Sequence, residues 1–370
     1  MMRIALVTPG YPPEVGGVES YVHRLAVELN ALGLVVDVLT QCPRGRAAEW
    51  TASEASSGIR VLRFEDWTGT RRFRIAPGLW HYLRQNGDVY DVIHVHSFHG
   101  IPALVACQAT NRPIVFTPHY HGVGHTFPAR ILHLLYDKLA TKIFTRSSYV
   151  LCVSDAEATI VVRDYPESVS RVHKVGAGID LEGIRQALPF DVERPIVLLM
   201  GRLESYKHID RAVEVFAACE CDADMVIIGS GPEKSFIMSL VDKLGVGSRV
   251  HILGYVDDSE ARRWQRTASV VMSLSAFEAF GLAVAEAAVA GARVVASDIP
   301  AHREVAAMAA NSFELVDLGM MDSEIATVLR RALKAPRVLN ADFTFPTWGE
   351  VGARVSAFYQ TIESASQSQT

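Results

Sequence analysis

Short runs of apolar residues alternate along the chain with longer stretches in which apolar positions recur at helical spacing. Runs of this length that are apolar almost throughout are typical of strands buried on both faces of a parallel sheet. Residues 17–33, GVESYVHRLAVELNALG, have the helical spacing and end at a glycine. The alternation therefore predicts βαβ units and an α/β fold. We predict strands at 3–8, 35–40, 59–64, 91–96, 113–118, 149–154, 196–201, 225–230, 249–254, 269–274 and 293–298.

The alternation is interrupted at residues 185–195, where RQALPFDVERP contains two prolines and charges of both signs. We interpret this segment as a linker, because 370 residues are too many for one ordinary core. We predict two doubly wound parallel-sheet domains, residues 1–187 and 190–346, and a final helix at 347–363. Two such domains facing each other would form a cleft between the carboxyl ends of their strands.

Composition narrows the class of protein. A formal net charge of −5 argues against a nucleic-acid-binding protein. The chain has five cysteines and no C-x-x-C pair, which predicts free thiols in a reducing compartment. No apolar run approaches the ~20 residues of a membrane span, and the start of the chain resembles a buried strand more than a signal peptide. We therefore expect a cytoplasmic protein.

Candidate chemistry follows the predicted strands. In residues 275–287, SAFEAFGLAVAEA, two carboxylates stand in an otherwise apolar stretch. Glu278 follows a strand, Phe280 and Gly281 lead into a helix that begins at Leu282, and Glu286 lies within that helix. Free N–H groups at the helix start suit a phosphate or a sugar hydroxyl, and a carboxylate suits the paired hydroxyls of a ribose. Alternatively, Glu278 stabilises the helix dipole and Glu286 pairs with a surface cation.

Two further segments of the second half point to a phosphorylated ligand. Arg202 and Lys207, in GRLESYKHID, lie between a strand and the next helix, where two cations could clamp a diphosphate. They could equally be solvated surface cations. Gly229 and Gly231, in IIGSGP, allow the backbone to approach a ligand closely, although tight turns alone also explain them.

The first half offers a glycine pair and two histidine clusters. Gly16 and Gly17 precede the first helix, whose N–H groups could bind a phosphate or an acceptor. The alternative is a plain turn in which Glu19 favours the helix N-terminus. HVHSFH (94–99) and HYHGVGH (119–125) contain three histidines each. Such histidines could bind a metal, as in metal-dependent hydrolases, but no acidic residue accompanies either cluster. We expect one or two of them to face the cleft and His94 to be a core residue.

In this order and spacing, these segments resemble glycosyltransferase family 4. The resemblance covers residues 3–362 and rests on Gly-Gly-x-Glu after the first strand, H-x-H, Thr-Pro-His, GRLxxxKxxxxAVEVF, IGSGP and E-x7-E. It implies the GT-B fold, with two facing Rossmann-like domains and a last helix that returns to the first domain. It also implies a retaining hexosyltransferase. Where the family often has paired glycines after the next strand, this chain has DIPAHRE (298–304), so we expect donor preference to depend on that loop.

The resemblance also implies a role for each matching position. Arg202 and Lys207 would hold the donor diphosphate, and Glu278 would lie beside the donor sugar. Phe280, Gly281 and Leu282 would lend backbone N–H groups, Glu286 would bind the nucleotide ribose, and Gly229 and Gly231 would line the donor site. His119 would lie near the anomeric centre, with Gly16 and Gly17 near the phosphate and acceptor.

The implied substrates are a UDP- or GDP-linked sugar and an acceptor glycan, lipid or small molecule, with no cofactor and no metal required. Residues 127–146, which are amphipathic and basic, could rest on an anionic membrane, and the cluster RRFR (71–74) could contact a membrane or an anionic acceptor, so a peripheral location at the inner membrane face is a second possibility. The alternatives are a domain helix with a solvated face for residues 127–146, which we favour, and an ordinary loop for RRFR. A GT-B-fold nucleotide-sugar epimerase and a metal-dependent hydrolase remain alternative functions.

Overall fold

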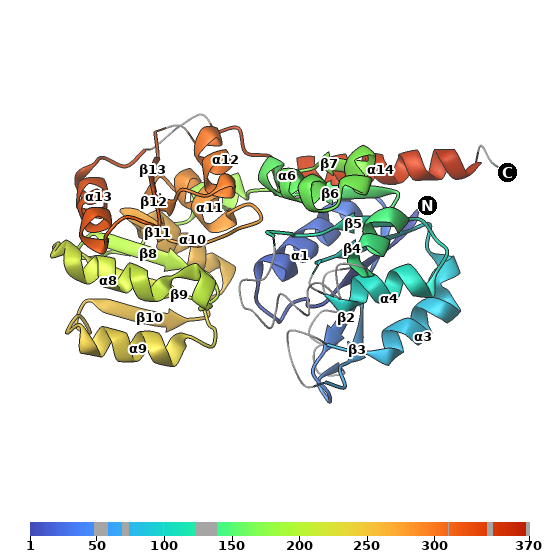
Figure 1. The fold of residues 1–370 in the computed structure, drawn as a ribbon, viewed down its shortest axis with the longest axis horizontal. Coiled ribbons are helices and arrows are strands. Elements are labelled where there is room, and N and C mark those ends of the chain that lie inside the picture. Colours follow the sequence, from blue (N-terminus) through green and yellow to red (C-terminus); the bar gives the residue numbers. More distant parts are fainter. Residues whose placement is uncertain are drawn as a thin grey trace. The chain divides into compact units, whose positions relative to one another are not determined.

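The computed structural model describes residues 1–47, 58–68, 74–98, 100–122, 139–309, 311–338 and 343–367. The chain divides into two compact units. The N-terminal unit contains residues 1–178 and 348–370, and the C-terminal unit contains residues 179–347. Each unit has its own parallel sheet and is described by itself (Figure 1).

The N-terminal unit is built on a seven-stranded parallel sheet with strand order β3-β2-β1-β4-β5-β6-β7. Helix α1 packs on α14, which comes from the end of the chain, and α3 packs on α4. The elements are β1 (Arg3–Thr8), α1 (Gly17–Ala31), β2 (Val35–Cys42), β3 (Arg60–Glu65), α3 (Pro77–Asn86), η1 (Gly87–Val89), β4 (Val92–His96), α4 (Ile101–Ala109), β5 (Ile114–Thr117), β6 (Tyr149–Cys152), α6 (Asp155–Asp164), η2 (Pro166–Arg171), β7 (Val172–Lys174) and α14 (Trp348–Gln367).

The C-terminal unit is built on a six-stranded parallel sheet with strand order β10-β9-β8-β11-β12-β13. Helices α8, α9 and α13 form one packed group, and α7, α10, α11 and α12 form another. The elements are α7 (Leu181–Gln186), β8 (Ile196–Met200), η3 (Ser205–Lys207), α8 (Ile209–Cys219), β9 (Asp224–Ile228), α9 (Lys234–Lys243), β10 (Val250–Gly254), α10 (Asp258–Thr267), β11 (Val270–Ser273), α11 (Leu282–Val289), β12 (Arg293–Ser297), α12 (Pro300–Met308), β13 (Phe313–Val316) and α13 (Asp322–Lys334).

The hydrophobic pattern identified the central strands well, because these are apolar on both faces. All eleven predicted strands are present, with ends displaced by no more than a few residues. The pattern missed β7 and β13, which lie at the edges of the two sheets and are only partly buried. Residues 187–195 have no regular structure, as expected of a linker, but the chain passes between units earlier, at Gly178–Ile179.

Each sheet reverses its strand order at one place, and these places locate the candidate site. In the N-terminal unit the reversal lies between β1 and β4, and in the C-terminal unit it lies between β8 and β11. Loops that follow the two strands at such a reversal diverge to opposite faces of the sheet and leave a crevice at its carboxyl edge. The loops that follow β8 and β11 carry Arg202, Lys207 and Glu278.

Candidate active site

Lys207 and Glu278 come together at the strand-order reversal of the C-terminal unit. Lys207 ends the short 3₁₀ turn after β8, and its ammonium group forms an ion pair with the Glu278 carboxylate from the loop after β11. The Lys207 side chain is 16% exposed and that of Glu278 is 18% exposed. A carboxylate this far buried is stable when it is paired, which answers why it stands in an apolar stretch.

Both members of this pair are charged at neutral pH. Burial lowers the pKa of Lys207, but the facing Glu278 carboxylate and Tyr206 outweigh burial and raise it above its ordinary value. Burial raises the pKa of Glu278, but Lys207 and the nearby His302 outweigh burial and lower it. The pair therefore presents a fixed cation and a fixed carboxylate side by side.

Arg202 is more accessible than Lys207. It lies in the same loop after β8, its side chain is 43% exposed, and its guanidinium is 3.6 Å from the Glu204 carboxylate. Its charge acts on Lys207 in the direction that lowers the lysine pKa. The loop thus brings two cations into electrostatic contact, as a diphosphate clamp requires.

The turn before α11 has the geometry predicted from Phe280-Gly281-Leu282. Phe280 is buried, Leu282 is the first residue of the helix, and Gly281 is its N-cap with φ of 101°. No side chain caps this helix start. Its first backbone N–H groups therefore remain available to an anion or a hydroxyl.

Replacing Gly281 by Ala should destabilise the protein by about 1–2 kcal/mol, because a residue with a β-carbon is strained at this positive φ. The new methyl group would also lie 3.1 Å from Val284 Cγ2 and 3.2 Å from His302 Cδ2. Urea denaturation should show the loss. Gly245→Ala is the comparison, because Gly245 also has a positive φ but has no atom within 4 Å of its would-be β-carbon. Equal losses in the two variants would exclude a contribution from packing around Gly281.

Glu286 is held by a residue that the sequence did not reveal. Gln265 of α10 is buried, and its Nε2 donates a hydrogen bond of 2.8 Å to Glu286 Oε2. A carboxylate oriented by an amide donor retains acceptor capacity for further hydroxyl groups.

Gly229 and Gly231 are required by packing between two loops. A β-carbon on Gly229 would lie 1.8 Å from the Gly201 carbonyl oxygen, and one on Gly231 would lie 2.2 Å from the Leu203 carbonyl oxygen. The loop after β9 therefore lies directly against the loop that carries Arg202. The missing side chains at Gly229 and Gly231 allow the loops after β8 and β9 to pack this closely, whether or not these glycines also contact a ligand.

In the N-terminal unit, His119 follows β5 with an unusual backbone conformation. Its φ of 50° is in the left-handed region, which is uncommon outside glycine. The ring packs on Tyr21 at 4.9 Å and stacks on His96 at 5.7 Å, with His96 Nδ1 3.4 Å from His119 Nε2. Burial lowers the pKa of His119 to about 3, so the ring is neutral at physiological pH. A backbone outlier of this kind is found most often at functional sites.

His94 and His96 of β4 are fully buried beside His119. His94 is fully buried in β4, as predicted, with Nδ1 2.6 Å from the Tyr359 hydroxyl and Nε2 2.8 Å from Thr117 Oγ1. Burial lowers the pKa of His94 to about 3 and that of His96 well below its ordinary value. His99 and His125 lie outside the described residues. Among the residues described, no three His, Cys, Asp or Glu side chains are grouped so that they could hold a metal ion.

Gly16 and Gly17 begin α1, as predicted, with Gly16 as N-cap in an extended conformation. The Glu19 carboxylate lies over this turn, since a β-carbon on Gly16 would be 2.1 Å from Glu19 Oε2. This supports the alternative that Glu19 stabilises the helix start. An incoming phosphate would have to displace that carboxylate.

Glu157 binds the backbone next to His119, a role that the sequence analysis did not predict. It is buried at the start of α6, where its two oxygens accept hydrogen bonds of 2.6 Å each from the N–H groups of Tyr120 and Val153. The signal was available as the capping pattern Ser154-x-x-Glu157, whose Ser154 hydroxyl accepts from the Glu157 N–H. Nothing in the sequence showed that the second oxygen would reach Tyr120.

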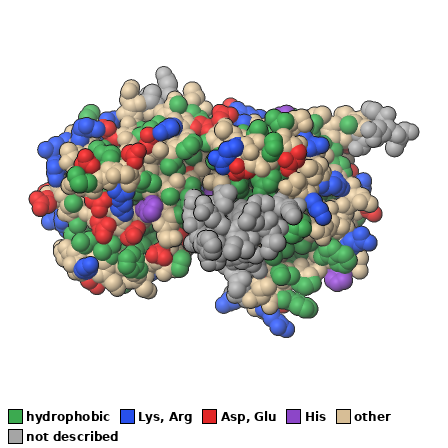
Figure 2. All heavy atoms as spheres, viewed as in Figure 1, with side chains coloured by type: hydrophobic (Ala, Val, Ile, Leu, Met, Phe, Trp, Pro, Cys, Tyr) green, Lys and Arg blue, Asp and Glu red, His purple; other side chains and the backbone are tan. Residues whose placement is uncertain are grey.

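The predicted membrane-facing segments are only partly described. Residues 71–73 and 123–138 lie outside the described ranges. Arg74 is buried and paired with Glu14 at 2.5 Å, so this member of RRFR is not available to a membrane, contrary to that prediction. In the parts of the chain that the structure covers, no helix is both long and apolar enough to cross a bilayer. Figure 2 shows acidic and basic side chains interspersed on the drawn face of the C-terminal unit.

Comparison with known proteins places the chain in a family. The sequence profile of Glycosyltransferase Family 4 matches residues 15–182, and that of Glycosyl transferases group 1 matches residues 180–340. Glycogen synthase from Mycobacterium tuberculosis (strain ATCC 25618 / H37Rv) is 26% identical over an alignment 404 residues long, gaps included. The alignment covers 96% of this chain and 94% of that protein.

Solved structures support the same assignment of the fold. Sucrose-phosphate synthase from Thermosynechococcus elongatus superposes with a TM-score of 0.83 at 21% identity and covers 99% of this chain and 100% of that one. HepE from Anabaena, in complex with UDP and glucose, has a TM-score of 0.77 at 16% identity and covers 97% of this chain and 100% of that one. The chain therefore belongs to glycosyltransferase family 4 and is a glycosyltransferase with the GT-B fold.

Proposed function

We propose that this glycosyltransferase moves a hexose from a UDP- or GDP-linked donor to a hydroxyl group of a glycan, lipid or small-molecule acceptor, with retention of anomeric configuration. The observation that carries the proposal is the Lys207–Glu278 pair at the strand-order reversal, next to the uncapped start of α11. A nucleotide sugar offers a diphosphate to the cations and hydroxyls to the carboxylate. The UDP and glucose bound by HepE favour a UDP-linked donor.

In the proposed mechanism, the acceptor oxygen attacks the anomeric carbon on the face from which the diphosphate departs. The new bond from the acceptor oxygen to the anomeric carbon forms as the bond to phosphate oxygen breaks, and the electron pair goes to the diphosphate. The acceptor's proton passes to the leaving phosphate oxygen. Lys207 and Arg202 stabilise the developing negative charge, so that no metal or other cofactor is required.

In the proposed site, Glu278 accepts hydrogen bonds from donor-sugar hydroxyls and Glu286 from the ribose. Phe280, Gly281 and Leu282 contribute backbone N–H groups, and the loops held by Gly229 and Gly231 shape the site. His119, neutral because of its lowered pKa, accepts or donates a hydrogen bond near the anomeric carbon. Gly16 and Gly17, at the start of α1, are assigned to the phosphate or the acceptor, and this role requires the Glu19 carboxylate to move away from the turn.

The first test is a thermal-shift comparison of UDP, GDP, ADP, CMP and dTDP on the wild type and on Glu286→Ala. One nucleotide should raise the melting temperature of the wild type, and the variant should lose most of that rise. Glu214→Ala, at an exposed position of α8, is the matched control and should keep it. If no nucleotide raises the melting temperature, or if Glu286→Ala responds like the control, the assigned donor site is wrong.

A second measurement separates the remaining functions. An epimerase would convert the sugar of the nucleotide sugar when no acceptor is present, which NMR of the recovered donor would detect. A transferase would instead require an acceptor or water to release the nucleoside diphosphate. A metal-dependent hydrolase would lose activity with a chelator, whereas the proposed transferase should keep it.

A further inference from the structure

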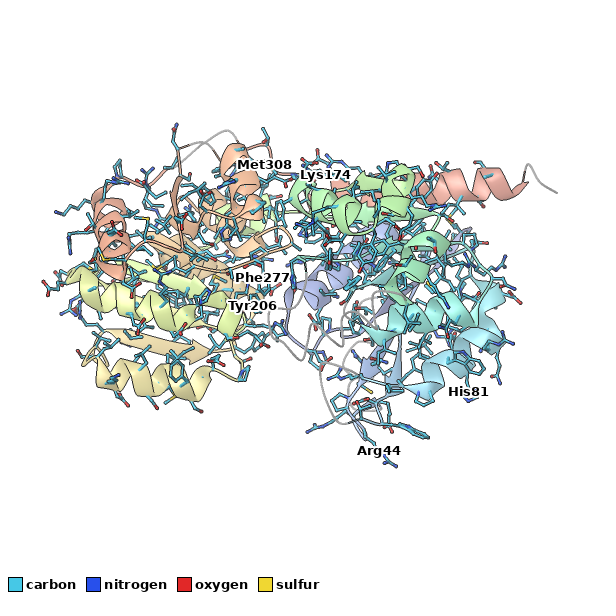
Figure 3. The ribbon with its side chains drawn as sticks, in the orientation of Figure 1. Arg44, His81, Lys174, Tyr206, Phe277 and Met308 are labelled. Carbon is cyan, nitrogen blue, oxygen red and sulfur yellow. The ribbon has the colours of Figure 1, made fainter. Side chains whose placement is uncertain are left out.

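An aromatic pair joins the two loops that carry Lys207 and Glu278. Tyr206 and Phe277 are the residues immediately before these two, and their rings stack nearly parallel, with centroids 4.5 Å apart and planes 12° apart. Figure 3 labels the two side chains, which lie beside each other in the C-terminal unit. The backbone adds a second link, because the Ala276 N–H donates a 2.8 Å hydrogen bond to the Tyr206 carbonyl oxygen.

The Tyr206 ring of this pair also contacts Lys207. Lys207 Nζ lies 5.4 Å from the centroid of the Tyr206 ring, within cation–π distance. Lysine has a flexible four-carbon stem, so its ammonium group occupies one place only if its surroundings restrain it. In this structure the restraints are the Glu278 carboxylate on one side and the Tyr206 ring on the other.

These two restraints differ in what happens when a donor binds. A diphosphate competes with Glu278 for Lys207, and donor-sugar hydroxyls compete with Lys207 for Glu278, so donor binding loosens the ion pair. The contact between the two ring faces and the Ala276–Tyr206 backbone hydrogen bond involve neither of the two charged groups that the donor engages. They can keep the two loops in register while the charged groups exchange partners.

We infer that Tyr206 and Phe277 are positioning residues, which hold Lys207 and Glu278 in register as the donor replaces their ion pair. This aromatic clasp, defined by Tyr206 and Phe277, rests on the proposed function for its catalytic consequence. Its structural part, the linkage of the two loops, does not depend on which sugar is transferred. The clasp acts through Lys207 and Glu278 and is assigned no contact with substrate.

The test uses Tyr206→Leu, Phe277→Leu and the double variant, with release of UDP from UDP-glucose as the activity. Each single variant should lower kcat tenfold or more while KM changes less than threefold. Because the two rings act as one unit, the kcat of the double variant should be no more than about threefold below that of the less active single variant. Tyr206→Phe and Phe277→Tyr preserve the stack and should keep at least half of kcat.

Phe190→Leu is the matched control, because Phe190 packs on Trp264 in the same unit, with ring centroids 4.5 Å apart and planes tilted by 38°. It should lower the melting temperature and leave kcat unchanged. Hydrogen exchange followed by mass spectrometry supplies a readout without substrate: residues 274–281 should exchange faster in Tyr206→Leu but not in Phe190→Leu.

The outcomes separate this inference from the proposed function. Wild-type kcat in Tyr206→Leu, or multiplicative losses in the double variant, would overturn the positioning role. Unchanged exchange of residues 274–281 would overturn the clasp itself. If the wild type binds no nucleotide and consumes no nucleotide sugar, the proposed function fails, and the exchange experiment still decides whether the clasp exists.

Discussion

Replacing Lys207 by Ala should lower turnover about 100-fold or more, equivalent to about 2.7 kcal/mol of transition-state stabilisation. The variant removes the cation that is least exposed and most firmly placed in the donor-side loops. As the bond to the diphosphate breaks, the leaving group gains negative charge, and a preorganised cation in a poorly solvated place stabilises this charge better than water does. Steady-state release of nucleoside diphosphate measures the effect.

Two controls make this prediction specific. Lys234→Ala removes an exposed lysine at the start of α9 in the same unit and should leave turnover unchanged. Lys207→Arg retains the charge but not the compact ammonium geometry, so we expect partial activity. If a folded Lys207→Ala protein turns over within threefold of the wild type, Lys207 is not the transition-state cation and the mechanism above must be abandoned.

The N-terminal unit should lose stability steeply when the pH falls below about 6.5. Desolvation lowers the pKa of the fully buried His94 and of the half-buried His119 to about 3 each, and it lowers the pKa of the fully buried His96 as well. In the unfolded chain these rings titrate near pH 6.5, so below that pH the unfolded state binds more protons than the folded state. Acid therefore favours unfolding. The free energy of unfolding should have its full value above pH ~6.5 and should fall as the pH decreases below that.

The expected size is large because three rings take part. Each contributes about 1.4 kcal/mol per pH unit between its unfolded and folded pKa, so the three together approach about 4 kcal/mol per pH unit. Urea denaturation followed by circular dichroism at pH 7.5 and 5.5 measures the difference. Most carboxylates remain ionised across this window, so the histidines should dominate the change.

A substitution identifies the source of the effect. His96 Nε2 is buried with no hydrogen-bond partner among the described residues, so His96→Gln removes one titrating ring while retaining a polar side chain. The number of protons taken up on unfolding, which the slope of the unfolding free energy against pH measures, should fall by about one. His81→Gln, at an exposed position of α3 labelled in Figure 3, is the matched control. Equal unfolding free energies at pH 7.5 and 5.5 in the wild type would contradict the assignment of these rings as neutral and buried.

The sequence pattern predicted which residues of the candidate site follow buried strands, but it did not predict which of them pair with each other. Lys207, Glu278 and Gly281 were singled out because each follows an apolar run that had to be a buried strand. Their positions at a strand-order reversal depend on the pairing of β8 with β11, which are separated in the chain by residues 201–269. The pattern allowed Glu278 to bind a ligand or to stabilise a helix dipole, and Lys207 to bind a ligand or to be solvated. It did not predict that the two side chains pair with each other.

The residues that the pattern missed share a physical reason. Gln265, Glu157 and the Tyr206–Phe277 stack act through contacts between segments far apart in the chain, and each looks unremarkable beside its sequence neighbours. Gly229 and Gly231 were noted as sites where a ligand could approach, but their β-carbons are excluded by the backbone of another loop. Local periodicity contains no information on such contacts.

The sequence by itself determined the class of fold and the order of its elements, because strands buried on both faces must be apolar runs and the helices that cover them must be amphipathic. It also determined which loops carry charge and glycine, and these features matched the family. Only the tertiary structure decided which loops meet, which carboxylates are paired and which histidines are neutral. Those properties depend on burial and on distances between residues remote in sequence, and the folded chain alone sets both.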